Sequence, residues 1–267
     1  MITFCINHDV KIKYFLHTSN NTPVFWKAAV EGKEAQNELL RLFNVITEAC
    51  HKIDMSAHPI QADMIFEDIS LNNEYSIKII APTKEHIDNY AKNFVNAPSE
   101  EEPGNKPSAN WLSTVIKIYS NKHNGYILLS SDSNKEAMFY NEKEPKVFKG
   151  KLILGQCPHH GAGESYKNAF WKLIRRDKNT PIVISVGHNN YGHPSEKVLL
   201  DLIKNNYNIY STNEVGAISK TKITLDAKET IIHLQTFGEF VPALKTDKLK
   251  GDKIFEIDSV GTVIFLN

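Results

Sequence analysis

Apolar residues recur at spacings of three and four along residues 33–53, a pattern that predicts an amphipathic helix with one buried face. Two strand-like runs follow at 63–69 and 75–80, and the turn formers between them predict a hairpin. A short helix capped by Thr83 comes next. The stretch 96–109 then combines three prolines with three consecutive acids and no large apolar side chain, so we expect an exposed, flexible loop there.

The second half of the chain changes from hairpins to alternating strands and helices. Runs at 113–119 and 125–129 surround a polar turn and predict another hairpin. A strand–helix–strand–helix order follows at 152–154, 166–175, 182–186 and 196–204. Ser195 is the expected N-cap of the last of these helices.

Strands are predicted again towards the carboxyl terminus, at 209–212, 217–225, 230–235, 254–257 and 262–266. The pattern contains no internal repeat at a fixed period. Strands with helices between some of them and hairpins between others favour two packed sheets covered by helices. We therefore expect a mixed α/β (α+β) fold in a single domain over 1–267, with the flexible loop at 96–109.

Composition narrows the class of protein. The 267 residues carry 31 basic and 31 acidic side chains, so no global field attracts nucleic acid, and a strongly basic coat protein is excluded. No apolar run approaches the length that spans a bilayer, and no signal peptide is recognisable, so we expect no membrane segment. Three cysteines without CxxC spacing fit a reducing compartment, and we expect a cytoplasmic protein.

Candidate chemistry stands directly after three predicted strands. Asp132 follows the strand 125–129, His159 and His160 follow 152–154, and His193 follows the next strand through a glycine-containing loop. If these strands are neighbours, the four side chains converge on one edge of the sheet. A carboxylate and imidazoles are the ligands that hold zinc or manganese, so a metal site is one interpretation.

Each residue also has a purely structural interpretation. Asp132 lies in Ser-Ser-Asp-Ser-Asn, where it can simply close a turn. His193 precedes a proline and can simply cap the following helix. The remaining histidines fit surface or core positions better than a ligand set. The order in which the four candidates occur therefore counts for more than any one of them.

That order, with its surrounding strands, resembles the carboxy-terminal half of the metallo-β-lactamase domain of ComEC-type DNA-uptake proteins and their soluble relatives. The resemblance covers residues 79–218, about half of the chain. Its landmarks are Ile79-Ile80-Ala81-Pro82, Asn110 to Ser113, the strand ending at Asp132, His159-His160-Gly161-Ala162, Asn190-Tyr191-Gly192-His193-Pro194 and Gly216-Ala217-Ile218.

The resemblance implies an αββα sandwich, a zinc or manganese cofactor and hydrolysis of a phosphodiester, as in a nuclease. In that family, bound metal lowers the pKa of a coordinated water and neutralises charge on the scissile group. Asp132 would be a metal ligand, either His159 or His160 would be a ligand or a phosphate contact, and His193 would contact metal or substrate. The catalytic residues would then be Asp132, His160 and His193.

The family's His-x-His-x-Asp-His signature is absent from this chain, and its nearest remnant is Asn7-His8-Asp9. We therefore expect a sandwich that lacks the amino-terminal metal-motif strands and a site of about three ligands, incomplete or empty in the isolated chain. A partner protein, a second copy or an amino-terminal segment outside this chain would complete it and cover the exposed sheet. The alternatives are a catalytically inactive scaffold that serves in binding or assembly, and an unrelated domain with an accidental likeness.

Overall fold

The computed structural model describes most of the chain, namely residues 2–8, 10–17, 32–61, 68–95, 109–135, 148–213, 215–218, 254–258 and 262–265. The chain forms two compact units. One comprises Met1–Ile65 with Pro82–Leu112, and the other comprises Phe66–Ala81 with Ser113–Asn267. The expected loop at 96–109 lies outside the described residues except for Ala109, where a short 3-10 turn begins. A single domain over 1–267 stays a prediction.

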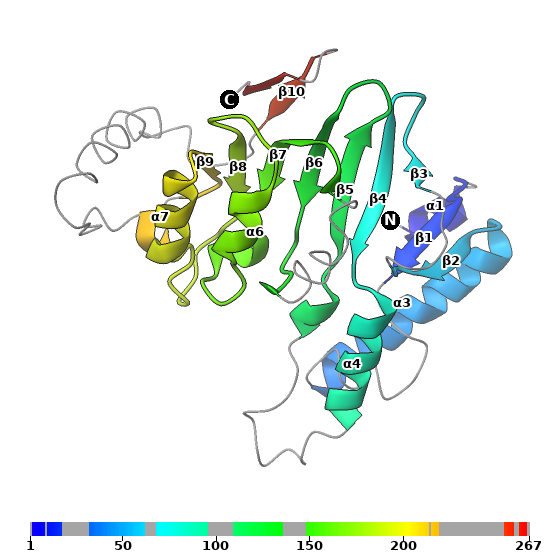
Figure 1. Cartoon of the computed structure of the whole chain (residues 1–267). Coiled ribbons are helices and arrows are strands. Elements are labelled where there is room, and N and C mark those ends of the chain that lie inside the picture. Colours follow the sequence, from blue (N-terminus) through cyan, green and yellow to red (C-terminus); the bar gives the residue numbers. More distant parts are fainter. Residues whose placement is uncertain are drawn as a thin grey trace. The chain divides into compact units, whose positions relative to one another are not determined.

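The larger unit is built on one seven-stranded sheet in the order β3-β4-β5-β6-β7-β8-β9 (Figure 1). Its strands are β3 (Ile69–Ser70), β4 (Tyr75–Ala81), β5 (Val115–Ser120), β6 (Gly125–Leu129), β7 (Lys151–Gln156), β8 (Pro181–Ile184) and β9 (Asn208–Ser211). The pairs from β3 to β6 are antiparallel, and those from β6 to β9 are parallel. The expected mixed α/β class is confirmed.

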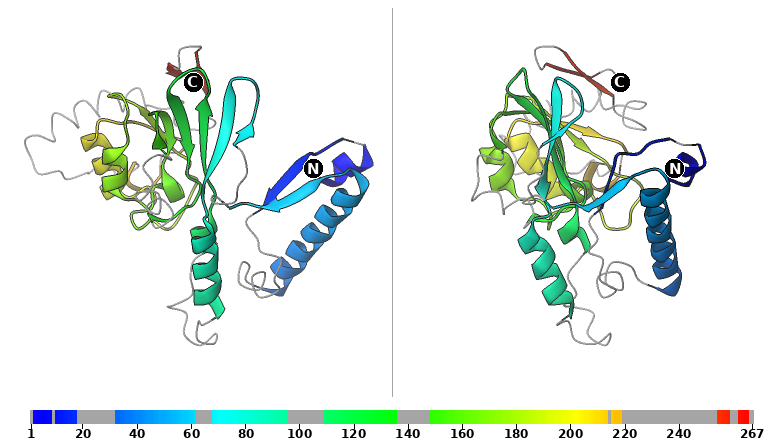
Figure 2. Two further views of the ribbon diagram at one scale, coloured as in Figure 1. Left: turned by 45° about the vertical axis from the view of Figure 1, so that its right-hand side comes forward. Right: turned by 90° about the vertical axis from the view of Figure 1, so that its right-hand side faces the viewer.

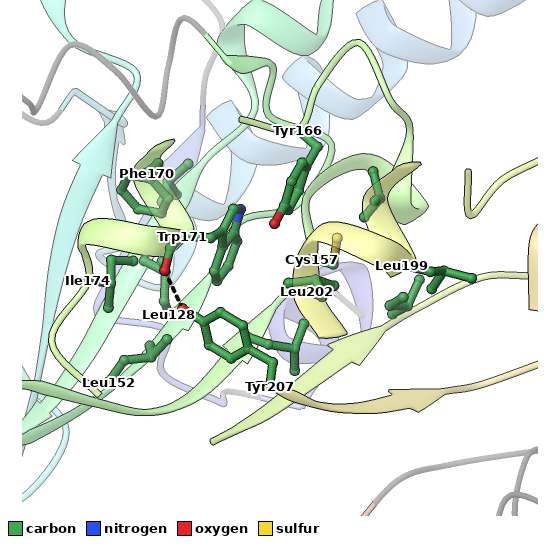
Figure 3. Close-up of a cluster of buried hydrophobic side chains, with 14 of the residues drawn as sticks. Leu128, Leu152, Cys157, Tyr166, Phe170, Trp171, Ile174, Leu199, Leu202 and Tyr207 are labelled. Carbon is green, nitrogen blue, oxygen red and sulfur yellow. Dashed lines mark hydrogen bonds between the residues drawn. The ribbon is translucent and has the colours of Figure 1, made fainter. Parts of the chain in front are cut away.

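Two helices cover one face of the parallel strands, α6 (Asn168–Leu173) and α7 (Glu196–Lys204). Figure 3 shows the aromatic centre of this core, where Trp171 is buried and the Tyr207 hydroxyl donates to its carbonyl oxygen at 2.7 Å. A Cβ on Gly155 of β7 would lie 3.2 Å from the Trp171 ring, so the absent side chain lets α6 approach the sheet. Burial of large aromatic surface in this layer stabilises the parallel half of the sheet.

The opposite face of the sheet is also apolar. Ile77 pairs with Ile118, Ile118 with Ile127, and Ile127 with Leu154, which forms one row across four strands. All four side chains are half-buried, whereas Leu128, which points to the helix-covered face, is fully buried. Because side chains alternate along each strand, the sheet has two hydrophobic faces, as a layer in the middle of a sandwich requires.

The smaller unit contains α1 (Ile2–Asn7), β1 (Tyr14–His17), α3 (Lys33–Lys52), β2 (Ser56–Pro59), α4 (Lys84–Val95) and the turn η2 (Ala109–Leu112). The strands β1 and β2 pair in parallel, and the helix α3 runs between them in the chain (Figure 2). Ile46 and Ala49 of α3 pack with Cys5 of α1 in one buried cluster. The predicted helix at 33–53 is confirmed. So is the cap at Thr83, whose hydroxyl accepts from the His86 amide at 3.2 Å.

Several predicted elements differ from the structure in their bounds. Of the strand expected at 63–69, residues 63–67 lie outside the described ranges, and β3 begins only at Ile69. The helix expected at 166–175 is shorter, because the chain after α6 turns to form a parallel bridge between Arg176 and Leu152. The strand expected at 182–186 ends at Ile184, since the Val186 amide donates to the Thr212 hydroxyl instead of to the sheet.

The strand expected at 217–225 was wrong in its first two residues. Gly216–Ile218 is a 3-10 turn, η6, because the Ala217 amide donates to the Pro194 carbonyl at 2.9 Å. The rest of that strand, and the one expected at 230–235, lie outside the described residues. The last two predicted strands are confirmed as an antiparallel pair, β10 (Phe255–Ile257) and β11 (Val263–Phe265).

Across the part of the chain that the structure describes, none of the helices has the length and apolar character needed to cross a bilayer.

Candidate functional site

The four candidate residues lie beyond the carboxyl ends of three neighbouring strands in the larger unit. Asp132 follows β6, His159 and His160 follow β7, and His193 follows β8. Because β6, β7 and β8 run parallel, their carboxyl ends meet at the same edge of the sheet. The polar residues that follow them are therefore brought together by the strand order itself.

The closest contact in this group joins Asp132 and His160. The Oδ1 atom of Asp132 lies 3.4 Å from Nε2 of His160, and the two side chains are 43% and 45% exposed, so solvent and small ions reach both. The other ring nitrogen, Nδ1, lies within hydrogen-bond distance of the Ser185 carbonyl oxygen. A carbonyl oxygen only accepts, so Nδ1 carries the proton, and the Nε2 position faces the carboxylate.

This tautomer has a chemical consequence for the pair. In the neutral ring, Nε2 offers a lone pair, and the carboxylate oxygen also offers lone pairs. Two acceptors at this separation face each other favourably only when a proton or a metal cation lies between them. The separation of Asp132 and His160 is therefore compatible with either a proton or a metal cation between them.

The backbone of the loop after β7 is held in an unusual conformation. His159 and His160 have φ values of 48° and 55°, in the left-handed region that few residues other than glycine adopt. The His159 amide donates to the Ser131 carbonyl at 2.9 Å, which ties this loop to the one that carries Asp132. Backbone of this kind occurs at binding and catalytic sites, where surrounding contacts hold it in place.

The side chain of His159 is anchored on the inner side of the loop. Its Nδ1 atom is 2.8 Å from the hydroxyl of Ser165, a residue only 3% exposed. The ring centroids of His159 and His160 are 6.1 Å apart. His159 therefore lies beside the pair of Asp132 and His160, with its ring fixed by Ser165.

His193 completes the group from the loop after β8. Its ring centroid lies 5.7 Å from that of His159, and its main chain exchanges hydrogen bonds with the Asn189 side chain at 3.0 Å in both directions. Partial burial lowers the pKa of His193, and the charges of His159 and His160 lower it further, while Glu164 opposes the shift. His193 is therefore neutral near pH 7 and has a lone pair to offer.

The structure thus brings all four predicted residues into one cluster, and their roles as ligands stay predictions. Within the described ranges, no set of three or more histidine, cysteine, aspartate or glutamate side chains surrounds a common point as a metal site would. Asp132 and His160 could hold a cation as a pair. His159 or His193 would have to rotate to join them.

Two parts of this site were not identified from the sequence. Ser165 contacts His159, and the carbonyl group of Ser185 contacts His160, across 6 and 25 residues of chain respectively. Ser165 lies in the glycine-containing segment directly after the two histidines, and this position was the only available signal. A backbone carbonyl leaves no signal in a sequence.

No protein-family model matches this chain, and no curated protein matches it either. The likeness to the metallo-β-lactamase domain consequently rests on the motifs and on the placement of the four residues.

Proposed function

We propose that this chain is a subunit of a metal-dependent hydrolase with the metallo-β-lactamase fold. Its substrate class is a phosphodiester, as in a nuclease, and its cofactor is zinc or manganese. The site is incomplete in this chain alone, and a partner protein or a second copy supplies the remaining ligands.

The observation that carries this proposal is the separation of Asp132 Oδ1 and His160 Nε2. In a tetrahedral zinc site with bonds of about 2.0–2.2 Å, two ligand atoms lie about 3.4 Å apart. The observed distance is 3.4 Å. The hydrogen bond from His160 Nδ1 to the Ser185 carbonyl is also the arrangement that orients a histidine ligand and fixes its tautomer.

Each residue then has a role. Asp132 and His160 hold the cation, and this favours His160 over His159 as the ligand from the histidine pair. His159 and His193 lie beside them and contact the phosphate or supply one further ligand. A divalent cation bound there would lower the pKa of a coordinated water and neutralise charge on the scissile oxygen.

The two apolar faces of the seven-stranded sheet support the proposed sandwich fold and the proposed partner. One face of the seven-stranded sheet packs under α6 and α7, and the other presents the half-buried row from Ile77 to Leu154. In an αββα sandwich, the second face packs against another sheet. The three cysteines Cys5, Cys50 and Cys157 are free thiols, which fits our assignment to the cytoplasm.

Calorimetric titration of the full chain with Zn²⁺, and separately with Mn²⁺, tests the proposal. The wild type should bind about one equivalent, and Asp132→Asn should weaken binding by at least about 100-fold, because the amide loses the charge that attracts the cation. Asp177→Asn is the matched control: it removes an exposed carboxylate paired with Lys151 and should leave affinity unchanged. Hydrolysis of a phosphodiester should require the partner as well as Asp132.

Three outcomes would overturn all or part of this assignment. If the wild type binds neither metal, and Asp132→Asn changes only stability, the chain is a scaffold that serves in binding or assembly. If Asp177→Asn weakens binding as much as Asp132→Asn, the metal is held by surface charge. If the isolated chain binds two equivalents and cleaves a phosphodiester unaided, no partner is needed, and further histidines such as His8, His17 or His58 must be ligands.

A further inference from the structure

Gln156, the last residue of β7, is the polar side chain that joins β7 to the loop carrying Asp132. Its Oε1 atom accepts the backbone amide of Ser130 at 3.1 Å and that of Ser131 at 3.2 Å. The Ser130 hydroxyl donates to the Gln156 backbone carbonyl. One residue thus makes three hydrogen bonds to the two positions that precede Asp132.

Those two positions determine where the Asp132 carboxylate lies. Ser131 has a φ of 47°, so the chain reverses sharply directly before Asp132. Its carbonyl group accepts from the His159 amide at 2.9 Å, which fixes the same peptide to the neighbouring loop. Without the Gln156 side-chain acceptor, the amides of Ser130 and Ser131 would lose two of the hydrogen bonds that hold this left-handed turn.

We infer that Gln156 is a positioning residue that holds Asp132 against His160. The inference rests on the proposed metal site for its functional meaning, but the geometry belongs to the protein without metal. Oε1 is the only Gln156 side-chain atom that can accept, so the carboxamide orientation is set by the two amides. The result is a carboxylate already placed at ligand distance before a cation arrives, which lowers the cost of binding.

Two substitutions separate this role from simple packing. Gln156→Met keeps the length of the side chain and removes the acceptor. Gln156→Glu keeps an acceptor oxygen at the same position. Gln36→Met, on α3 in the other unit, controls for replacing a half-buried glutamine by methionine.

Amide hydrogen exchange and Zn²⁺ titration on the same full-length variants test the inference. In metal-free protein, Gln156→Met should speed exchange of the Ser130 and Ser131 amides by at least about tenfold, and Gln156→Glu should keep them protected. Gln156→Met should also weaken Zn²⁺ binding by about tenfold, the usual effect of removing a group that orients a ligand. Gln156→Glu should restore the affinity, and Gln36→Met should change neither measurement.

The outcomes distinguish this inference from the proposed function. If exchange at Ser130 and Ser131 is the same in Gln156→Met and the wild type, the inference is wrong whether or not metal binds. If exchange speeds up but Zn²⁺ affinity stays that of the wild type while Asp132→Asn abolishes binding, Gln156 is structural only, and the inference is again overturned. If the wild type binds no Zn²⁺, the proposed function fails, and faster exchange in Gln156→Met alone still establishes that Gln156 holds the turn.

Discussion

The two loops that supply histidines to the site differ in how they are held. In the loop after β7 (157–167), hydrogen bonds hold the His159 main chain and the rings of both histidines, through the Ser131 carbonyl, the Ser165 hydroxyl and the Ser185 carbonyl. The loop after β8 (185–195) has the same length and is fixed at its base, where the Val186 amide donates to the Thr212 hydroxyl and the Ser195 amide donates to the Gly161 carbonyl. Asn189 bonds to the main chain of His193, while Tyr191 near the tip is 83% exposed and stacks on His193.

This difference separates two tasks within one site. A fixed loop presents His160 to Asp132 at a constant distance, as the proposed metal site requires. A loop anchored at its base and open at its tip can contact a larger molecule while His193 keeps its place. The comparison can be tested with substitutions in each loop, some at residues that make fixing contacts and some at residues that make none of them. The measured quantity is the change in the free energy of unfolding.

The largest loss of folding stability is expected for a substitution at the base of the loop after β8. A Cβ on Gly216 would lie 2.3 Å from the His193 carbonyl oxygen, and Gly216 has a φ of +59°. Gly216→Ala should lower the free energy of unfolding by about 3 kcal/mol, because the clash involves backbone and the conformation disfavours alanine. Urea denaturation of the full chain measures the loss.

Gly192→Ala is the matched variant at the open side of the same loop. Gly192 has a φ of +76°, but a Cβ there would meet nothing within 4 Å. Only the conformational cost of about 1 kcal/mol is expected. Equal losses at the two glycines would mean that the loop is not anchored specifically at its base.

The next largest loss of stability is expected when the Ser165 hydroxyl, which holds the His159 ring in the loop after β7, is removed. Ser165→Ala removes the hydrogen bond to His159 Nδ1 and should cost about 1 kcal/mol, since the hydroxyl is buried. Ser185→Ala should change stability by less than about 0.5 kcal/mol, because His160 contacts the carbonyl group of that residue and its side chain is exposed. Thermal or urea unfolding of both variants measures the two losses. A larger loss of stability for Ser185→Ala than for Ser165→Ala would contradict the assignment of Ser165 as the side chain that holds His159.

The strands that precede the candidate residues, and the order of those residues, could be predicted from the sequence because both depend on local signals. Alternating apolar runs located β5 and β6, and Ser195 was identified as the cap of α7, where its hydroxyl accepts from the Val198 amide. Once three strands are parallel neighbours, Asp132, His160 and His193 must meet at one edge.

The contacts that fix the site could not be predicted in the same way. Gln156 and Ser130 are 26 residues apart, and their hydrogen bonds exist only because β6 and β7 are adjacent. Left-handed backbone at His159 has no glycine or asparagine to mark it. The short strands β1 and β2 carry too few alternating apolar residues to be recognised, since each has only four residues.

A smaller change in stability, a gain instead of a loss, is expected for a substitution at Ser131. Its φ of 47° is unfavourable for any residue with a Cβ, and its side chain is exposed. Ser131→Gly should raise the free energy of unfolding by about 0.5 kcal/mol, because relief of strain exceeds the extra freedom of glycine in the unfolded chain. Asn206→Gly, at a φ of 57° outside the site, should gain less, since asparagine tolerates this region. A loss of stability in Ser131→Gly would show that the serine side chain contributes to the turn.

The smallest effect is the pH dependence that His193 adds. Its pKa is lowered in the folded protein, chiefly by partial burial, so the unfolded chain binds more protons as the pH falls through the ordinary histidine range near ~6.5. The stability that neutral His193 contributes is therefore present above that range and is lost on acidification towards pH 5. His193→Gln should show a smaller loss of stability than the wild type between pH 7 and 5, measured by urea denaturation at each pH.

Glu164→Gln should show a larger loss of stability than the wild type over the same pH range, because Glu164 raises the pKa of His193 and its removal lets that pKa fall further. If both variants change the slope in the same direction, burial and the charge of Glu164 do not oppose each other at His193.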